Sequence, residues 1–125
     1  MKKTLLCAVL VMVGLLIITG CGKGNLKEFA GTYKLEYSKY VGDPDTAKST
    51  EEWTITLNED GTGKSNRDDA SYDAEWSMDG EAITFTEKFM GIKNEYNGTI
   101  KDGKMDIFNG DKTNDLTMEA VFNKQ

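Results

Sequence analysis

The sequence predicts an all-β domain, an antiparallel meander of about eight strands that closes into a small barrel. After Phe29, apolar and polar residues alternate with a period of two, and no stretch shows a sustained helical period. Turn signals such as Asp79-Gly80 and Asp102-Gly103 join successive runs, which makes the strands sequential antiparallel neighbours. Closure would remove the two exposed edges of such a sheet. An open sheet folded into a sandwich is the alternative.

Each expected strand has one apolar face, and those faces would point inward. The runs span Tyr33–Tyr37, Trp53–Leu57, Gly63–Ser65, Ala74–Met78, Ile83–Phe85, Tyr96–Ile100, Met105–Ile107 and Leu116–Phe122. The single proline, Pro44, falls in a polar stretch where it cannot disturb a strand ladder. Phe89, Met90 and Ile92 surround Gly91 and could form a lid, a partner-facing patch or a strand continuation that packs inside, and of these we expect packing.

The N-terminal segment predicts export. Lys2 and Lys3 precede an uncharged apolar run from Leu5 to Ile18, whose length suits a signal-peptide helix. A membrane-spanning helix needs roughly 20 apolar residues. The run is therefore short for a transmembrane anchor.

The residues that follow resemble the lipobox of bacterial lipoproteins, namely Ile18-Thr19-Gly20-Cys21. The resemblance implies a signal peptide at 1–20, a lipidated cysteine with a short tether at 21–28, and a barrel domain at 29–125. It also implies a chain held by lipid, such as palmitate, on Cys21 at the extracytoplasmic face of the cell membrane. Two or more acyl chains suffice for stable anchoring. A flexible tether of seven residues would span on the order of 15 Å.

Composition excludes several kinds of chemistry. All 21 acidic residues but only 13 of the 15 basic ones follow residue 20, which leaves a formal charge of −8 on the mature chain. Such a domain is repelled by nucleic acid and by anionic lipid, so we expect membrane contact through the lipid on Cys21. There is no histidine, Cys7 would leave with the signal peptide, and lipid would consume Cys21. No disulfide, thiol nucleophile, cofactor or metal site is expected.

Several segments resemble bacterial lipocalin-like domains, which are small barrels of the calycin type. They are Leu26–Leu35, Ile55–Gly63, Trp76 with Ile83–Phe85, and Ala120–Lys124. The resemblance implies a non-enzymatic barrel that binds a small apolar or amphipathic ligand. Two residues depart from the family pattern. Tyr33 replaces the usual tryptophan, and Lys124, not an arginine, is the basic residue near the end.

Five aromatic residues are expected on inward faces and are candidates to line a ligand cavity: Tyr33, Tyr37, Trp53, Trp76 and Tyr96. The alternative is that they fill the barrel as its core. A filled barrel would then act as a structural or interaction module that contacts an envelope protein or polymer.

Acidic residues suggest two further kinds of site, and we expect neither. Asp68, Asp69 and Asp73 lack the spacing of a calcium-binding EF-hand loop. Glu51 with Glu52, or Glu75, could be nominated for hydrolysis of wall glycans by paired carboxylates. Exposed strand glutamates are, however, usually solvated.

Overall fold

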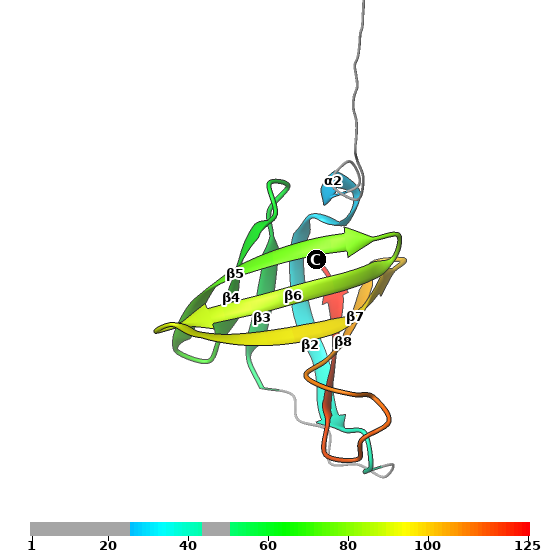
Figure 1. The fold of residues 1–125 in the computed structure, drawn as a ribbon. Coiled ribbons are helices and arrows are strands. Elements are labelled where there is room, and N and C mark those ends of the chain that lie inside the picture. Colours follow the sequence, from blue (N-terminus) through cyan, green and yellow to red (C-terminus); the bar gives the residue numbers. More distant parts are fainter. Residues whose placement is uncertain (1–25, 44–50) are drawn as a thin grey trace, which may run out of the picture.

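The computed structural model describes residues 26–43 and 51–125 as one short helix and eight strands (Figure 1). The elements are α2 (Leu26–Phe29), β2 (Gly31–Tyr40), β3 (Trp53–Leu57), β4 (Thr62–Arg67), β5 (Ala70–Asp79), β6 (Ala82–Phe89), β7 (Ile92–Lys101), β8 (Lys104–Phe108) and β9 (Met118–Lys124). The predicted signal peptide at 1–20, Cys21 and most of the predicted tether lie outside the described residues. Within the described ranges, no helix is long and apolar enough to cross a membrane.

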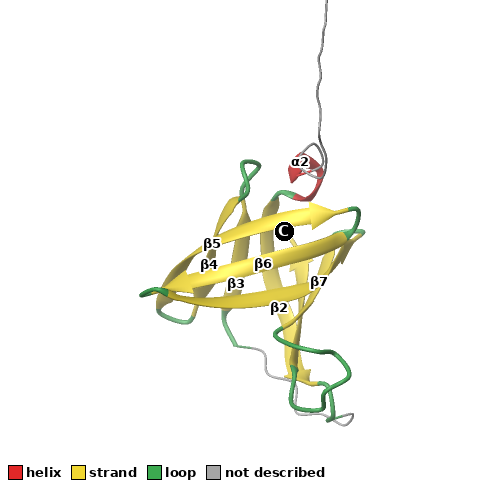
Figure 2. Ribbon diagram, in the orientation of Figure 1, coloured by secondary structure: helices red, strands yellow, loops and turns green. Residues whose placement is uncertain are grey.

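The strands form a closed antiparallel barrel, as Figure 2 shows. Each strand pairs with the next along the chain, and β9 returns to pair with β2 through contacts such as Leu35 with Phe122. The predicted all-β class and the closed eight-stranded meander are therefore confirmed. The sandwich alternative is excluded, because neither β2 nor β9 is left as an open edge.

The core lies inside the barrel because burial alternates along the strands as the sequence alternates. β3 shows this most simply: Trp53, Ile55 and Leu57 are buried, whereas the two threonines between them are partly exposed. Apolar side chains from every strand except β4, together with Leu26 of α2, form one cluster. Burial of such side chains contributes roughly 1.5–3 kcal/mol each.

Tyr37 does not point inward, contrary to the prediction. A β-bulge interrupts the pairing of β2 with β9 between Leu35 and Tyr37. One extra residue shifts the period-two alternation, so that Ser38 is buried instead and Tyr37 lies on the outer face. Tyr37 there pairs with Val121 of β9.

The two ends of the barrel differ. The helix end carries α2, the β3–β4, β5–β6 and β7–β8 turns and the C-terminus (Figure 1). Leu26 of α2 is buried in the core, and the Tyr33 hydroxyl donates a 2.7 Å hydrogen bond to the Phe29 carbonyl. The structure thus adds Leu26, which the sequence placed in the tether, to the packed domain. The opposite end, called the loop end below, carries residues 41–43, 51–52, 68–69, 90–91 and 109–117.

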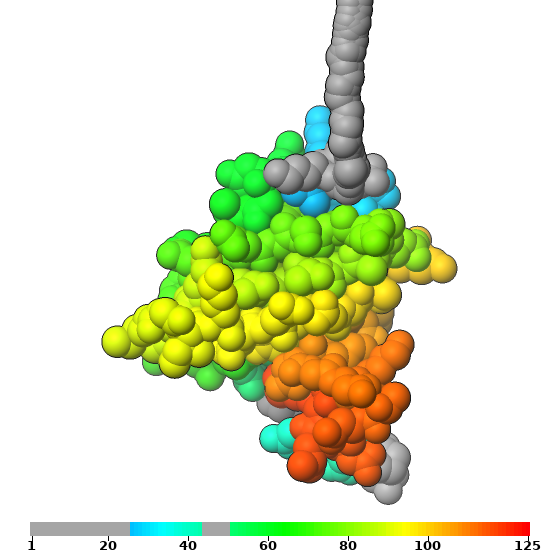
Figure 3. Space-filling model, in the orientation of Figure 1, coloured from blue at the N-terminus to red at the C-terminus, as the bar shows by residue number. Residues whose placement is uncertain are grey.

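Two apolar segments at the loop end are more exposed than predicted. Phe89 and Ile92 flank a tight turn of Met90 and Gly91 at the tip of the β6–β7 hairpin. Met90 and Ile92 face solvent, and Phe89 is half exposed, with its ring edge-on to that of Tyr72 at 5.3 Å between centres. The expectation that this group packs inside is wrong, because the strand ends there. Leu116 precedes β9 instead of belonging to it and is 81% exposed. In the space-filling view the hairpin tip projects at the left edge (Figure 3).

Candidate functional site: a polar cluster at the loop end

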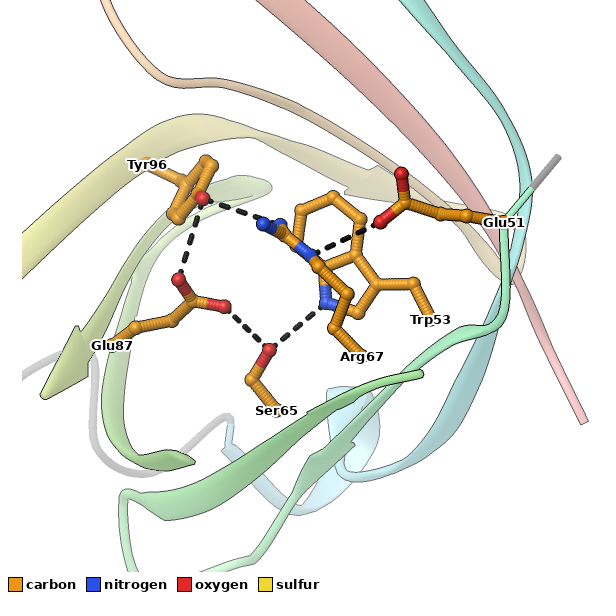
Figure 4. Close-up of polar contacts among 6 residues, drawn as sticks. All are labelled: Glu51, Trp53, Ser65, Arg67, Glu87 and Tyr96. Carbon is orange, nitrogen blue, oxygen red and sulfur yellow. Dashed lines mark hydrogen bonds and ion pairs between the residues drawn. The ribbon is translucent and has the colours of Figure 1, made fainter. Parts of the chain in front are cut away.

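Six residues near the loop end form a connected polar cluster, drawn in Figure 4. We call these residues the loop-end cluster: Glu51, Trp53, Ser65, Arg67, Glu87 and Tyr96. They come from the chain just before β3 and from β3, β4, β6 and β7. The alternating phase of the strands brings their side chains together, since Trp53 pairs with Arg67 across β3 and β4.

Ser65 joins two buried groups of the cluster. The Trp53 indole Nε1 donates a 2.9 Å hydrogen bond to Ser65 Oγ, and that hydroxyl donates a 2.5 Å hydrogen bond to Glu87 Oε2. Glu87 is only 3% exposed, so its carboxylate lies inside the barrel wall. An unpaired carboxylate there would be strongly unfavourable, and hydrogen-bond donors are therefore required.

Tyr96 supplies the second donor. Its hydroxyl donates to Glu87 Oε1 at 3.3 Å and accepts a long 3.4 Å hydrogen bond from Arg67 Nη2. Burial raises the pKa of the Tyr96 hydroxyl, the Glu87 charge raises it further, and the Arg67 hydrogen bond opposes the rise. Tyr96 therefore stays protonated at neutral pH and keeps a proton to donate.

Arg67 lies at the outer side of the cluster. Its guanidinium carbon stacks 3.5 Å from the Trp53 ring centre, and its Nε forms a 3.2 Å ion pair with Glu51. Both side chains are about one-third exposed, so the pair faces water on one side. The Nε atom itself is buried, so the exposed part of the pair is formed by the rest of the two side chains.

The interior below the cluster is filled. Phe122 packs edge-on against Trp53 at 5.0 Å, and Phe85 lies 6.2 Å from the Tyr96 ring. Both phenylalanines are fully buried. A ligand of this cluster would consequently sit at the loop end instead of passing deep into the barrel.

The five predicted aromatic residues divide into three groups. Trp53 and Tyr96 meet at the cluster, with ring centres 6.0 Å apart. Tyr33 and Trp76 are buried near the helix end, where the Trp76 indole donates to the Asn58 carbonyl at 2.9 Å. Tyr37 lies outside. That the inward residues contact a ligand remains a prediction.

The sequence interpretation missed Ser65, Arg67 and Glu87. Glu87 follows Ile83 and Phe85 in the same inward phase, and that phase was the available signal. Arg67 is the only arginine in the chain and shares its phase with Ser65. A charged side chain in the apolar phase of a strand indicates a buried polar site more directly than the aromatic residues do.

Several of the acidic residues considered above for metal binding or catalysis form ion pairs with basic side chains. Glu75 pairs with Lys88 at 3.1 Å and Asp73 with Lys64 at 2.7 Å, both on the outer face. Across residues 26–43 and 51–125, no group of three or more acidic or sulfur side chains could hold a metal ion. Glu51 pairs with Arg67 at 3.2 Å.

No protein-family model and no curated protein matches the chain. Among solved structures, the chain is similar to a mutant of the fluorescent protein UnaG, with a TM-score of 0.48 and 18% identity over 78% of this chain and 96% of that one. It is also similar to the REP1-NXSQ fatty acid transporter, with a TM-score of 0.47 and 16% identity over 79% of this chain and 97% of that one.

Proposed function

We propose that this chain is a membrane-anchored, extracytoplasmic lipoprotein whose barrel is a non-enzymatic module for binding a small amphipathic ligand at the loop end. The anchor is proposed from the lipobox-like residues that end at Cys21. Binding is proposed from one observation, the buried Glu87 carboxylate linked through Tyr96 to the partly exposed Arg67.

Stability alone does not explain this cluster. Replacing buried charges by well-packed apolar side chains is often neutral or stabilising, so a barrel that needed only a core could do without Glu87 and Arg67. Convergent polar groups in an apolar setting are instead typical of small-molecule sites, where they fix the orientation of a ligand.

The arrangement favours an amphipathic ligand. Its polar end would exchange with Glu51 on Arg67, whose planar donors suit carboxylate and phosphate oxygens. Its apolar part would lie beside Arg67 at the rim, because Trp53 is only 1% exposed and its ring is covered by the guanidinium. Because Phe122 and Phe85 fill the space beneath, we expect a small ligand held at the rim.

Native mass spectrometry of residues 23–125, secreted from the original host without the lipid, tests the binding proposal. We expect a reproducible extra mass that is lost on denaturation. Arg67→Ala should abolish it, whereas Lys64→Ala, which removes a cation from the outer face, should retain it. A clean apo mass in the unaltered protein would instead favour the filled-barrel interaction module.

Acyl labelling tests the anchor separately. Cys21→Ser should release the protein from the membrane fraction, or leave an uncleaved precursor without acyl label. Unchanged acylation and unchanged processing in that variant would contradict the anchoring proposal.

A further inference from the structure

Residues 88–93 form a distinct projecting tip, which we call the fingertip. Phe89 pairs with Ile92 across the hairpin, and Lys88 pairs with Lys93 one step further from the turn. Met90, at the apex, is 85% exposed. The fingertip is thus an apolar apex with a pair of lysines behind it.

The backbone conformation of the turn does not require an apolar residue at its apex. Met90 and Gly91 both have positive φ values, 49° and 81°. The β7–β8 turn has the same pattern with Asp102 and Gly103, at 53° and 79°. Asp or Asn tolerates this conformation better than methionine does. A bulky apolar residue at the apex is therefore unfavourable both for the backbone and for exposure to water.

We propose that the fingertip inserts into the interfacial region of the membrane to which the chain is anchored. This inference rests on the proposed anchoring at Cys21. Phe89, Met90 and Ile92 would enter the headgroup–acyl boundary, while Lys88 and Lys93 would remain at the level of the phosphates. The fingertip thereby adds a second, protein-based contact to the lipid.

The anchor brings the fingertip within reach of the bilayer. Five residue steps separate Cys21 from Leu26, and an extended chain covers at most about 3.6 Å per residue, or about 18 Å in total. In Figure 1 the β6–β7 hairpin projects sideways relative to α2. α2 lies at the helix end and the fingertip at the loop end, so a barrel lying along the membrane would place both against one surface.

Size and charge favour lipid over a protein partner. A stable protein interface needs roughly 800 Å² on each partner, whereas the fingertip offers three apolar side chains. The mature chain carries a formal charge of −8 and is repelled by anionic lipid as a whole. Lys88 and Lys93 make the fingertip locally cationic, although Lys88 also contacts Glu75 at 3.1 Å.

A labelled, fully processed lipoprotein tests this contact. Met90→Cys introduces a thiol that can carry an environment-sensitive fluorophore, because lipid would occupy Cys21 and Cys7 would be removed. The protein is reconstituted in vesicles of phosphatidylcholine and phosphatidylglycerol that contain nitroxide-labelled acyl chains. Asp69→Cys, at the tip of the neighbouring polar hairpin, carries the same fluorophore as the matched control.

We expect the acyl nitroxide to quench the fluorophore at position 90 several-fold more strongly than the one at position 69. Adding Phe89→Ser and Ile92→Ser should remove that difference while the far-ultraviolet circular dichroism stays unchanged. Equally weak quenching at both positions, in an acylated protein bound to vesicles, would contradict insertion of the fingertip but not anchoring through Cys21. Loss of acylation would overturn both. A third outcome would be an apolar environment for the fluorophore at position 90 in the absence of vesicles, with a particle size that grows with protein concentration. This outcome would overturn membrane insertion and would show instead that the fingertip contacts a second copy of the chain.

Discussion

The guanidinium of Arg67 lies over the indole of Trp53, with its central carbon 3.5 Å from the ring centre. The two residues are direct cross-strand partners on β3 and β4. Arg67 is the only arginine of the sequence. The barrel obtains the contact from the neighbouring strand, at the place where the buried cluster meets water.

Arg67→Lys should therefore behave as a disruptive substitution. Lysine has no planar group to cover the indole and donate to Tyr96 at the same time. We expect the free energy of unfolding, measured by denaturant titration, to fall by about 0.5–1 kcal/mol. Lys64→Ala, at an exposed ion pair, is the control and should change it by less than about 0.5 kcal/mol. Equal effects of the two substitutions would contradict a specific role for the stack.

Ser65→Ala tests the centre of the cluster. The substitution leaves the Trp53 indole N–H without its acceptor and removes one donor from Glu87. Leaving a buried polar group without a hydrogen-bond partner costs roughly 1–3 kcal/mol. We expect the free energy of unfolding, measured by thermal and chemical unfolding, to fall by an amount in that range. Ser77→Ala, at an exposed position of β5, should be nearly neutral. A neutral Ser65→Ala would mean that the hydrogen bonds of Figure 4 add nothing to stability.

The fold could be predicted from sequence because its signals are local. Period-two alternation gives each strand one inward face, and Asp102-Gly103 forms a tight two-residue turn in which both residues have positive φ. Barrel closure followed from the penalty for free edges. The β2 bulge could not be predicted in this way, because one extra residue in a regular alternation leaves no mark until β9 is present to pair with it. Tyr37 was misplaced for that reason.

The site was less predictable because it depends on non-local register. Ser65 and Glu87 are 22 residues apart and meet only when β4, β5 and β6 have fixed positions. The aromatic residues were visible in the sequence, but bulk alone does not distinguish a cavity lining from a core. The fingertip was misjudged for a different reason, since apolar residues around a glycine fit either a buried strand or an exposed turn.

Gly98→Ala tests the closest approach of two strands. A Cβ atom at Gly98 would overlap the carbonyl oxygen of Asp106 on β8, and backbone atoms cannot move aside cheaply. We expect a loss of about 3 kcal/mol or more in the free energy of unfolding. Gly80→Ala is the control, because a Cβ there meets open space. Its positive φ of 64° should cost only about 1–2 kcal/mol. If Gly80→Ala were the more damaging change, backbone conformation and not strand contact would dominate.

Asp106→Asn tests a pH dependence that arises on the outer face. Partial burial, followed by the hydrogen bond and charge of Glu119, raises the pKa of Asp106 from 3.8 to about 7. Between these values the folded state holds a proton that the unfolded state has lost. The stabilising contribution of this group is thus complete below its unfolded pKa and declines as the pH rises to about 7. The shift would correspond to about 4 kcal/mol for a fully buried group. Asp106 is only partly buried, so we expect about 1 kcal/mol after solvent screening.

The asparagine variant removes this titration, so its stability relative to the unaltered protein should improve between pH 4.5 and pH 8. Denaturant unfolding at both pH values measures the change. Asp73→Asn provides a control of opposite sign, because the Lys64 hydrogen bond and charge lower the pKa of Asp73. Its carboxylate stabilises the fold above its unfolded pKa and loses that effect in acid, so Asp73→Asn should be least harmful at low pH. An equal difference in the free energy of unfolding between Asp106→Asn and the unaltered protein at both pH values would contradict this. It would mean that the folded state takes up no extra proton at Asp106 between pH 4.5 and pH 8.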